Sequence, residues 1–518
     1  MQEMPTIQWP CPESGWQGLR VLVVGAGESG CAMADWLQRR GADVLLVDSR
    51  PEQTTPKGLV VQWQTPTPFD AGLLADRQML ALSPGLSPNA ECQSPLLALL
   101  DYAKENGISV VGELDLFDWA LSHLGRMDNA KEEGKSLALD RPPVVAITGT
   151  NGKTTTARLT AHLLRAAGMD VQEAGNQGPS LLRGLLEREA LGRWPQVWVL
   201  ELSSFQLALA HRFAPTVATV LNLSQDHLDW HSDMQDYMAA KLRVFGIAQP
   251  TACTMVVNRG EDELLAALDA LRPKTKSRSL PFVSFGIGPA SSHRPGFGLL
   301  HQGIDWIAHW PEDPELKPQR LLPLEALRIT GGHNSLNAMA ALGLAMQVSP
   351  DLAPMLHALT QYEGEPHRMQ PVAAIDSVTF INDSKGTNTG ATMAALRGTE
   401  GPIAIILGGL GKSQDFSGLV RLLAERRAHV VTIGQAGPEM GEACQQAGLQ
   451  VQPAGSLDDA VTHAWQWARD HALQTGAQVM VLLSPACASF DMFESYVDRG
   501  HKFSQAVTRL AEQEGQPC

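Results

Sequence analysis

The most informative stretch of the sequence is Val144-Val145-Ala146-Ile147-Thr148-Gly149-Thr150-Asn151-Gly152-Lys153-Thr154-Thr155-Thr156. Its first four residues are apolar and long enough for one buried strand, and residues 157–167 are predicted to form a helix that ends at Gly168. Two glycines, Lys153 and a run of threonines separate the strand from the helix. This order is that of a phosphate-binding loop, in which backbone N–H groups face the anion, Lys153 supplies a positive charge and the Thr154 hydroxyl binds Mg²⁺.

The loop departs from the general pattern, because Gly149 and Gly152 enclose two residues where four are usual. A short glycine turn before a helix is by itself more often a plain turn, but the buried strand and the Lys-Thr pair favour a phosphate site. A helix terminus contributes only about 0.3–1 kcal/mol toward an anion, so Lys153 and a metal ion must share the charge of a triphosphate.

The composition is that of an acidic protein with ordinary cores. The 518 residues suffice for about three domains, 44% of them are apolar, and the formal net charge is −15. General nucleic-acid binding needs a basic face, so we expect no nucleic-acid partner. The seven cysteines are irregularly spaced without a CxxC pair, which favours reduced thiols over disulfides or zinc. The start is not leader-like and no apolar run reaches membrane-spanning length, so we expect a cytoplasmic protein without membrane contact.

A dinucleotide-binding fingerprint lies near the start of the chain. A strand is predicted over Leu19–Val24, the motif Gly25-Ala26-Gly27-Glu28-Ser29-Gly30 follows, and a helix and a second strand lead to Asp48-Ser49-Arg50. By itself this βαβ unit suggests NAD. Glu28 is unfavourable to a pyrophosphate, however, and Arg50 suits a phosphate or a uracil carbonyl. The glycines could also serve only for packing, and Leu80–Gly85 is predicted to face the same crevice.

The middle of the chain offers several candidate ligands. The turn Gly175–Gly178 could bring an amide to a phosphate or be a plain turn. The predicted strand Val197–Glu201 ends in a carboxylate that could bind Mg²⁺ or cap the helix at Ser203. His227 and His231 are four residues apart, as in some zinc sites, but the third ligand of such a motif is missing.

Lys241 is predicted to lie on an apolar helical stripe with Met234, Tyr237, Met238 and Phe245. An uncompensated buried ammonium group is costly, so such a lysine finds a partner or loses its proton. One interpretation is that its amine reaches water. The other is that a neutral amine reacts with CO₂ to give a carbamate, which is an anionic metal ligand.

The rest of the chain alternates strands and helices. Residues 126–141 are predicted to be a polar linker or insertion, and Phe282–Gly303 a loop. Asn334 or Asn337 could cap the helix predicted over Ala338–Met346 or reach a base edge. In the last third, polar groups follow four predicted strands, over Val378–Ile381, Ile403–Leu407, His429–Ile433 and Val479–Leu483. We therefore expect an α/β protein with mostly parallel, doubly wound sheets that bind ligands at the carboxyl ends of the strands.

Eight motifs together resemble the Mur ligases of peptidoglycan synthesis, in particular the branch that adds D-glutamate. They are Gly149–Thr154, Glu201–Leu207, Asp226–Asp229, Ala239–Lys241, His333-Asn334, Pro366–Arg368, Asn382–Lys385 and Leu483–Ser489. The motifs run in family order across nearly the whole chain, and the shortened glycine loop is the family's own form. The first domain matches less specifically, and the two polar segments lengthen the chain beyond the family norm.

This resemblance implies three domains: a Rossmann-like UDP-binding domain over 1–112, a central P-loop-type ATPase domain over 113–362 and a C-terminal Rossmann-like domain over 363–518. It implies that ATP phosphorylates the carboxylate of UDP-N-acetylmuramoyl-L-alanine and that the D-glutamate amine attacks the acyl phosphate. Two Mg²⁺ ions and a carbamate on Lys241 would assist, and domain closure would complete the site. We expect the enzyme to act as a monomer.

The resemblance also assigns residues to roles. For ATP these are Gly149, Thr150, Asn151, Gly152, Lys153, Thr154, Thr155, Asn337, Arg368 and Asp383. For the two metal ions they are Thr154 with Glu201, and His227 with Lys241. For the UDP-sugar they are Ser29, Asp48, Ser49, Arg50, Gly85 and Asn176. For D-glutamate they are Lys385, Thr387, Lys412, Ser489, Phe490 and Tyr496, the last at a position where the family has Phe.

Three other hypotheses fit parts of the sequence. The chain could be a sibling ligase for another amino acid or a folylpolyglutamate-type enzyme, which the third domain decides. It could be an NAD-dependent oxidoreductase fused to a regulatory ATPase. The third hypothesis is that the chain is a non-catalytic nucleotide-binding protein. The full set of candidate metal ligands argues against this hypothesis.

Overall fold

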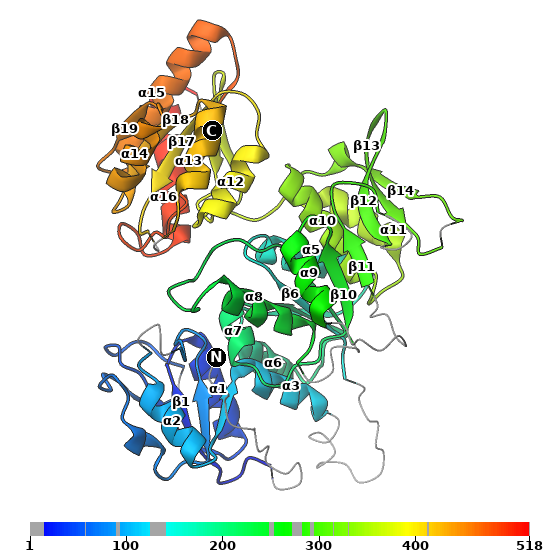
Figure 1. Ribbon diagram of the computed structural model, residues 1–518, viewed down its shortest axis with the longest axis vertical. Coiled ribbons are helices and arrows are strands. Elements are labelled where there is room, and N and C mark those ends of the chain that lie inside the picture. The colour runs from blue at the N-terminus through cyan, green and yellow to red at the C-terminus, as the bar shows by residue number, and fades with distance from the viewer. Residues whose placement is uncertain are drawn as a thin grey trace. The chain divides into compact units, whose positions relative to one another are not determined.

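The computed structural model describes residues 15–56, 58–89, 94–124, 141–247, 253–271, 282–290, 295–313, 315–329, 331–411 and 414–516. These residues form two compact units, whose helices and strands are labelled in Figure 1. The first unit takes in the described residues up to Leu223, together with Leu228–Ala326 and Leu336–Thr360. The second takes in Ser224–His227, Leu327–Ser335 and the described residues from Gln361 onward.

The first sheet of the first unit is parallel throughout, with the order β3-β2-β1-β4-β5. Its strands are β1 (Arg20–Val24), β2 (Asp43–Val47), β3 (Val61–Gln62), β4 (Met79–Leu82) and β5 (Ser109–Gly112). Its helices are α1 (Glu28–Arg39), the 3₁₀ turn η1 (Ala71–Leu74), α2 (Leu97–Glu105) and α3 (Glu113–Ser122). A Cβ on Gly30 would lie 1.7 Å from the Gly25 carbonyl oxygen, so the last glycine of the fingerprint lets α1 approach β1 closely.

The second sheet has nine strands in the order β14-β13-β12-β11-β10-β9-β6-β8-β7. The strands are β6 (Val144–Thr148), β7 (Val171–Gly175), β8 (Val197–Glu201), β9 (Val217–Val220), β10 (Thr254–Asn258), β11 (Phe282–Phe285), β12 (Gly296–Gln302), β13 (Ile304–Trp310) and β14 (Gln319–Pro323). Strands β12, β13 and β14 pair antiparallel and the others parallel.

Helices follow most of these strands. They are α5 (Lys153–Ala166), α6 (Leu181–Leu191), α7 (Ser204–Leu209), α8 (Met234–Leu242), η3 (Arg243–Phe245), α9 (Asp262–Leu271), η5 (Leu324–Ala326), α10 (Gly332–Ala345) and α11 (Leu352–Gln361). A continuous core joins the first two sheets, in which Phe117 of α3 meets Trp198 of β8 edge to face with ring centroids 5.0 Å apart. Helix α6 packs against both α1 and α3 (Figure 1).

The sheet of the second unit has the order β15-β16-β20-β17-β18-β19 and is parallel except for β15 at its edge. Its strands are β15 (Gln370–Ile375), β16 (Val378–Asn382), β17 (Ile403–Gly408), β18 (His429–Ile433), β19 (Val451–Pro453) and β20 (Val479–Leu483). Its helices are α12 (Thr389–Arg397), α13 (Ser417–Arg426), α14 (Gly437–Gln446), α15 (Leu457–Thr475) and α16 (Tyr496–Gln513). The predicted α/β class with mostly parallel sheets is confirmed.

Two helix starts and one loop were predicted wrongly. Helix α5 begins at Lys153, not at residue 157, and α10 begins at Gly332, so Asn334 and Asn337 lie within that helix and do not precede it. The predicted loop Phe282–Gly303 contains strands β11 and β12. Pairing on both sides explains the strand at Gly296, where a Cβ would lie 1.9 Å from the Ser284 carbonyl oxygen, so only glycine allows this approach.

The described residues also bear on the expectations from composition. The cysteines described there, at positions 31, 253, 444 and 487, are free thiols. No described helix combines the length and apolarity needed to cross a bilayer. Of the predicted polar insertion at 126–141, only Arg141 lies within the described residues.

Candidate active site

The phosphate-binding loop runs from Gly149 into the first turn of α5. The Thr150 amide donates to the Asn222 carbonyl oxygen at 3.0 Å and the Asn151 amide to Asn222 Oδ1 at 2.8 Å. Gly152, at the helix N-cap, has φ 80°, and a Cβ there would lie 2.5 Å from Asn337 Oδ1. The glycine therefore allows a left-handed turn and a close approach of Asn337. Asn222, which the sequence did not single out, holds the loop from the other side.

Two lysines from different elements converge on one carbonyl oxygen of this loop. Lys153 Nζ donates to Gly149 O at 2.9 Å and to Thr150 O at 2.8 Å, and Lys241 Nζ donates to Gly149 O at 2.8 Å. Lys241 is only 2% exposed, so its amine does not reach water as one interpretation suggested. Two amines on one oxygen repel each other when both are protonated.

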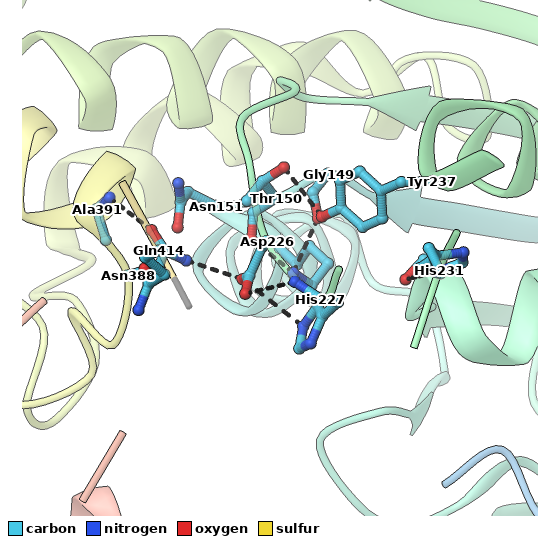
Figure 2. Close-up of polar contacts among 12 residues, drawn as sticks. Gly149, Thr150, Asn151, Asp226, His227, His231, Tyr237, Asn388, Ala391 and Gln414 are labelled. Atoms are coloured by element: carbon cyan, nitrogen blue, oxygen red, sulfur yellow. Dashed lines mark hydrogen bonds and ion pairs between the residues drawn. The ribbon is translucent and has the colours of Figure 1, made fainter. Parts of the chain in front are cut away.

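Tyr237 links Lys241 to the loop on the same side. Its ring lies 4.5 Å from Lys241 Nζ. Its hydroxyl is 3.0 Å from Thr150 Oγ1 (Figure 2). Both residues come from α8, as the predicted apolar stripe requires. The cation–π contact favours the protonated lysine by about 0.5–2 kcal/mol, so it opposes the repulsion from Lys153.

Glu201 ends β8 beside the strand that leads into the loop, in register with Ile147 of β6. Asn176 donates twice to this residue, from its amide to Glu201 O at 2.8 Å and from Nδ2 to Oε1 at 2.9 Å. Glu201 is 4% exposed, and its Oε2 is buried without a hydrogen-bond partner. A buried carboxylate oxygen of this kind suits a cation, because burial of an uncompensated charge is costly.

The two candidate threonines that follow Lys153 are buried. Thr154 and Thr155 lie in the first turn of α5 and are 6% and 5% exposed. Asn337 Oδ1 accepts from Thr156 Oγ1 at 3.3 Å, so α10 contacts the start of α5.

His231, the other member of the apparent zinc pair, is fully buried. Its Nε2 lies 3.0 Å from Ser204 Oγ, and its Nδ1 lies 3.1 Å from Asp236 Oδ2. It is a core histidine whose pKa burial lowers.

The fingerprint of the first sheet is built around Asp48. Asp48 Oδ2 accepts from the Ala26 amide at 2.7 Å and from Arg50 Nη2 at 2.7 Å, and Oδ1 accepts from Arg50 Nε at 2.9 Å. Burial disfavours the charge on Asp48, but these hydrogen bonds outweigh it and hold its pKa below the usual value. Ser29 begins α1 with Glu28, and Ser49 and Gly85 follow β2 and β4. All five predicted UDP residues of this sheet thus lie at or after the carboxyl ends of its central strands.

In the second unit, Asp383 follows β16 and is buried. Ser484 Oγ donates to its Oδ2 at 2.7 Å and the Met369 amide to its Oδ1 at 3.2 Å. Burial raises the pKa of Asp383 to about 6, while these bonds and the nearby Arg368 charge lower it. Asp383 and Arg368, both predicted to hold ATP, are therefore close to each other.

The loop that carries His227 contacts the start of α12. Asn388 caps α12 by accepting from the Ala391 amide at 2.8 Å, and its Nδ2 donates to Asp226 Oδ2 at 3.0 Å (Figure 2). Asp226 Oδ1 accepts from the His227 amide at 3.0 Å, and His227 has φ 57°. Neither Asp226 nor Asn388 was a predicted site residue. In the sequence, the only indication of a role for Asp226 and Asn388 is that they lie next to the predicted site residues His227 and Thr387.

Five of the six predicted D-glutamate residues follow the carboxyl ends of β16 and β20 in the sequence. Lys385 Nζ lies 3.7 Å from the centre of the Tyr496 ring, so tyrosine at this position contacts the lysine. Ser489 is 2% exposed and Phe490 is 70% exposed. Thr387 lies two residues after Lys385, and Lys412 lies outside the described residues.

Arg499, which the sequence did not suggest, joins the two loops. It is fully buried, and it donates to Ser384 O at 2.8 Å, Ser384 Oγ at 3.0 Å and Cys487 O at 3.1 Å. Burial lowers its pKa to about 10. The segments before Lys385 and Ser489 are thus tied together by one guanidinium group.

Among the described residues, no three His, Cys, Asp or Glu side chains gather as a ready metal site. His227 and Lys241 fall in different units, and Thr154 and Glu201 in the first.

Family models match three consecutive parts of the chain. They are the Mur ligase MurD-like N-terminal domain over residues 19–112, the Mur ligase middle domain over 147–345 and the Mur ligase glutamate ligase domain over 367–487. A crystal structure of MurF from Acinetobacter baumannii has a TM-score of 0.54 at 17% identity and covers 96% of this chain and 93% of that one. This last likeness shows the fold alone.

Two curated relatives match nearly the full length. The chain is 43% identical over 522 residues to the UDP-N-acetylmuramoylalanine–D-glutamate ligase of Cupriavidus pinatubonensis, which covers 96% of this chain and 98% of that one. It is 41% identical over 524 residues to the protein of the same name from Albidiferax ferrireducens, with the same coverage. With this identity over 96% of its length, and with three consecutive family models matched, the chain belongs to the Mur ligase family, in the branch whose curated members are named UDP-N-acetylmuramoylalanine–D-glutamate ligases.

Proposed function

We propose that this chain is an ATP-dependent ligase that joins D-glutamate to the alanyl carboxylate of UDP-N-acetylmuramoyl-L-alanine in peptidoglycan precursor synthesis. The names of its full-length relatives support the substrates. The structural observation that supports ATP-dependent chemistry lies at the carboxyl ends of β6 and β8. There a phosphate-type loop with two lysine amines on Gly149 O adjoins the buried carboxylate of Glu201.

The reaction needs positive charge and positioning. A carboxylate is a poor electrophile, and bringing it to the γ-phosphate of ATP places two anions side by side. Once the carboxylate is phosphorylated, the D-glutamate amine attacks the acyl carbon, and the tetrahedral intermediate expels phosphate. Lys153 moves from the loop carbonyls to the ATP phosphates, because an anion is a stronger partner for an ammonium group than a neutral carbonyl.

Mg²⁺ fits the residues at the end of β8. The Thr154 hydroxyl and the unpartnered Glu201 Oε2 are hard oxygen donors, the kind that Mg²⁺ prefers. We propose that they hold the ion, which when bound polarises phosphate oxygens. Asn176 orients the carboxylate by its bond to Oε1. For the second Mg²⁺ we propose His227 and a carbamate on Lys241, a pair supported by the chemistry of its donor atoms.

The remaining roles are proposals of the same kind. Gly149 to Thr155, Asn337, Arg368 and Asp383 hold ATP, whereas Ser29, Asp48, Ser49, Arg50, Gly85 and Asn176 face the UDP-sugar. Lys385, Thr387, Lys412, Ser489, Phe490 and Tyr496 receive D-glutamate. We propose that these functions divide over three domains, residues 1–112, 113–362 and 363–518, and that the enzyme acts as a cytoplasmic monomer.

A comparison of amino acids tests the proposed function. With ATP, Mg²⁺ and UDP-N-acetylmuramoyl-L-alanine present, we expect D-glutamate to support phosphate release at least about 100-fold better than L-glutamate, L-alanine or L-lysine, because unpaired buried polar groups reject the wrong substrate. Phosphate release and the mass of the product are measured together.

A preference for another amino acid would indicate a sibling ligase. It would also contradict the proposal that Lys385 and Ser489 bind D-glutamate. The oxidoreductase hypothesis is tested in the same preparation, since it predicts that NADH fluorescence changes on binding and that a UDP-sugar does not bind.

A further inference from the structure

Helix α3 presents three buried acidic side chains to the second sheet and its connections. Glu113, Asp115 and Asp118 are 2%, 0% and 1% exposed. Each accepts backbone N–H groups from a segment that flanks the second sheet. Such acids are costly to bury unless they are hydrogen-bonded, so each of these contacts is specific.

Glu113 binds the first turn of α6. Its Oε1 accepts from the Leu182 amide at 2.9 Å. The hydroxyls of Ser29 and Ser180 lie beside this carboxylate. Burial raises the pKa of Glu113 to about 6, while Ser29, Leu182 and Ser180 lower it.

Glu28 binds the same helix start from α1. Its Oε1 accepts from the Ser180 amide at 2.8 Å. Free N–H groups and the positive end of the helix dipole at a helix start favour carboxylates there. Glu28 therefore points toward α6, which explains an acidic residue inside a glycine loop that faces a diphosphate.

The start of α6 directly follows the turn that carries Asn176. The Gly175 amide closes this turn on the Pro179 carbonyl oxygen at 2.8 Å, and Asn176 binds Glu201 through both its amide and its side chain. Glu28, Glu113, the α6 start, Asn176 and Glu201 thus form one continuous chain of contacts in the first unit.

We propose that Glu113, supported by Glu28, is a positioning residue that fixes the Asn176 turn against the glycine loop of the first sheet and so couples binding of the UDP-sugar to the orientation of Glu201. This inference rests on the proposed function, because it uses the roles given there to Ser29 and Glu201. The carboxylates act through hydrogen bonds to backbone amides and do not contact the reacting atoms.

Asp118 offers a matched control. It lies on the same helix and is equally buried, but it accepts from the Ala214 amide at 3.2 Å and from Arg212 Nε at 3.0 Å. These partners lie between α7 and β9, away from the Asn176 turn. Asp118→Ala should therefore affect stability without the kinetic signature of Glu113→Ala.

The test is the kinetics of the full chain with UDP-N-acetylmuramoyl-L-alanine, ATP, D-glutamate and varied Mg²⁺. For Glu113→Ala we expect the KM for the UDP-sugar and the half-saturating Mg²⁺ concentration each to rise about 10-fold, because a misplaced turn misplaces Asn176 and Glu201. The KM for D-glutamate stays within about 2-fold. Glu113→Gln keeps the acceptor for Leu182 and should stay within about 3-fold of wild type throughout.

If Glu113→Ala does not fold, Glu28→Ala serves as the test variant, because Glu28 is exposed. It should raise the KM for the UDP-sugar and the half-saturating Mg²⁺ concentration about 3-fold. Unchanged UDP-sugar and Mg²⁺ parameters in a folded Glu113→Ala or in Glu28→Ala would overturn the inference, and so would an equal rise in Asp118→Ala. A wild-type enzyme without Mg²⁺-dependent, D-glutamate-dependent phosphate release would instead refute the proposed function.

Discussion

Replacing Lys241 with alanine is expected to lower turnover by about 10³-fold or more, equivalent to about 4 kcal/mol, since the proposed anionic metal ligand and its charge would be lost together. Short carboxylic acids such as formate or acetate should restore part of the activity. The measurement is steady-state phosphate release by the variant with and without added carboxylate.

The reason lies in the surroundings of the amine. Lys241 is 2% exposed, and its Nζ shares the Gly149 carbonyl oxygen with Lys153 Nζ. The proposed carbamate would form from the neutral amine, which is the form that reacts with CO₂. A carbamate there would turn a repulsive pair of cations into an attractive pair of opposite charges. In the alanine variant, a small carboxylate can occupy the space of the carbamate.

Lys153→Ala provides the matched control for this rescue, since Lys153 binds the same carbonyl oxygen but is proposed to act as a cation. Carboxylates should restore nothing in that variant. Equal rescue of both variants, or wild-type activity in Lys241→Ala, would rule out a carbamate.

Lys153→Ala is itself expected to lower kcat by about 10²–10³-fold, the effect typical of removing one charged group that stabilises a transition state. The KM for ATP should rise as well, because the helix terminus alone contributes only about 0.3–1 kcal/mol toward the phosphates. Phosphate release at varied ATP measures both parameters.

The fold of this variant should be intact. Lys153 is part-buried and donates to loop carbonyls that water can also satisfy, so the thermal unfolding midpoint should stay within about 2 °C of wild type. Lys153→Arg keeps the charge but changes its shape and should retain more activity than alanine. A folded Lys153→Ala with normal ATP dependence would contradict the phosphate-loop interpretation.

The sequence predicts those site residues that directly follow buried strands. Lys153 and Glu201 come after the apolar runs of β6 and β8, and parallel strands that pair bring their carboxyl ends to one edge. The burial of Lys241 follows from its apolar helical stripe. Each of these inferences uses a local pattern whose geometry the sheet or helix fixes.

Contacts between distant segments leave no such pattern. Asn222 and Asn388 are ordinary polar residues after a strand and before a helix, and nothing in the sequence pairs them with the phosphate loop or with Asp226. Glu113 is one of two acids in the first turn of α3, where a helix dipole alone would explain them. The strands at Phe282–Gly303 escaped prediction because their stability comes from pairing with β10 and β13, not from their own glycine-rich composition.

The most direct measurement follows oxygen from the substrate carboxylate. UDP-N-acetylmuramoyl-L-alanine labelled with ¹⁸O in its alanyl carboxylate is incubated with the enzyme, ATP, Mg²⁺ and D-glutamate, and the released phosphate is analysed by mass spectrometry. Activation of the carboxylate by ATP predicts one ¹⁸O atom in each phosphate released from doubly labelled substrate. Unlabelled phosphate alongside a D-glutamyl product would contradict the acyl-phosphate route on which the account depends.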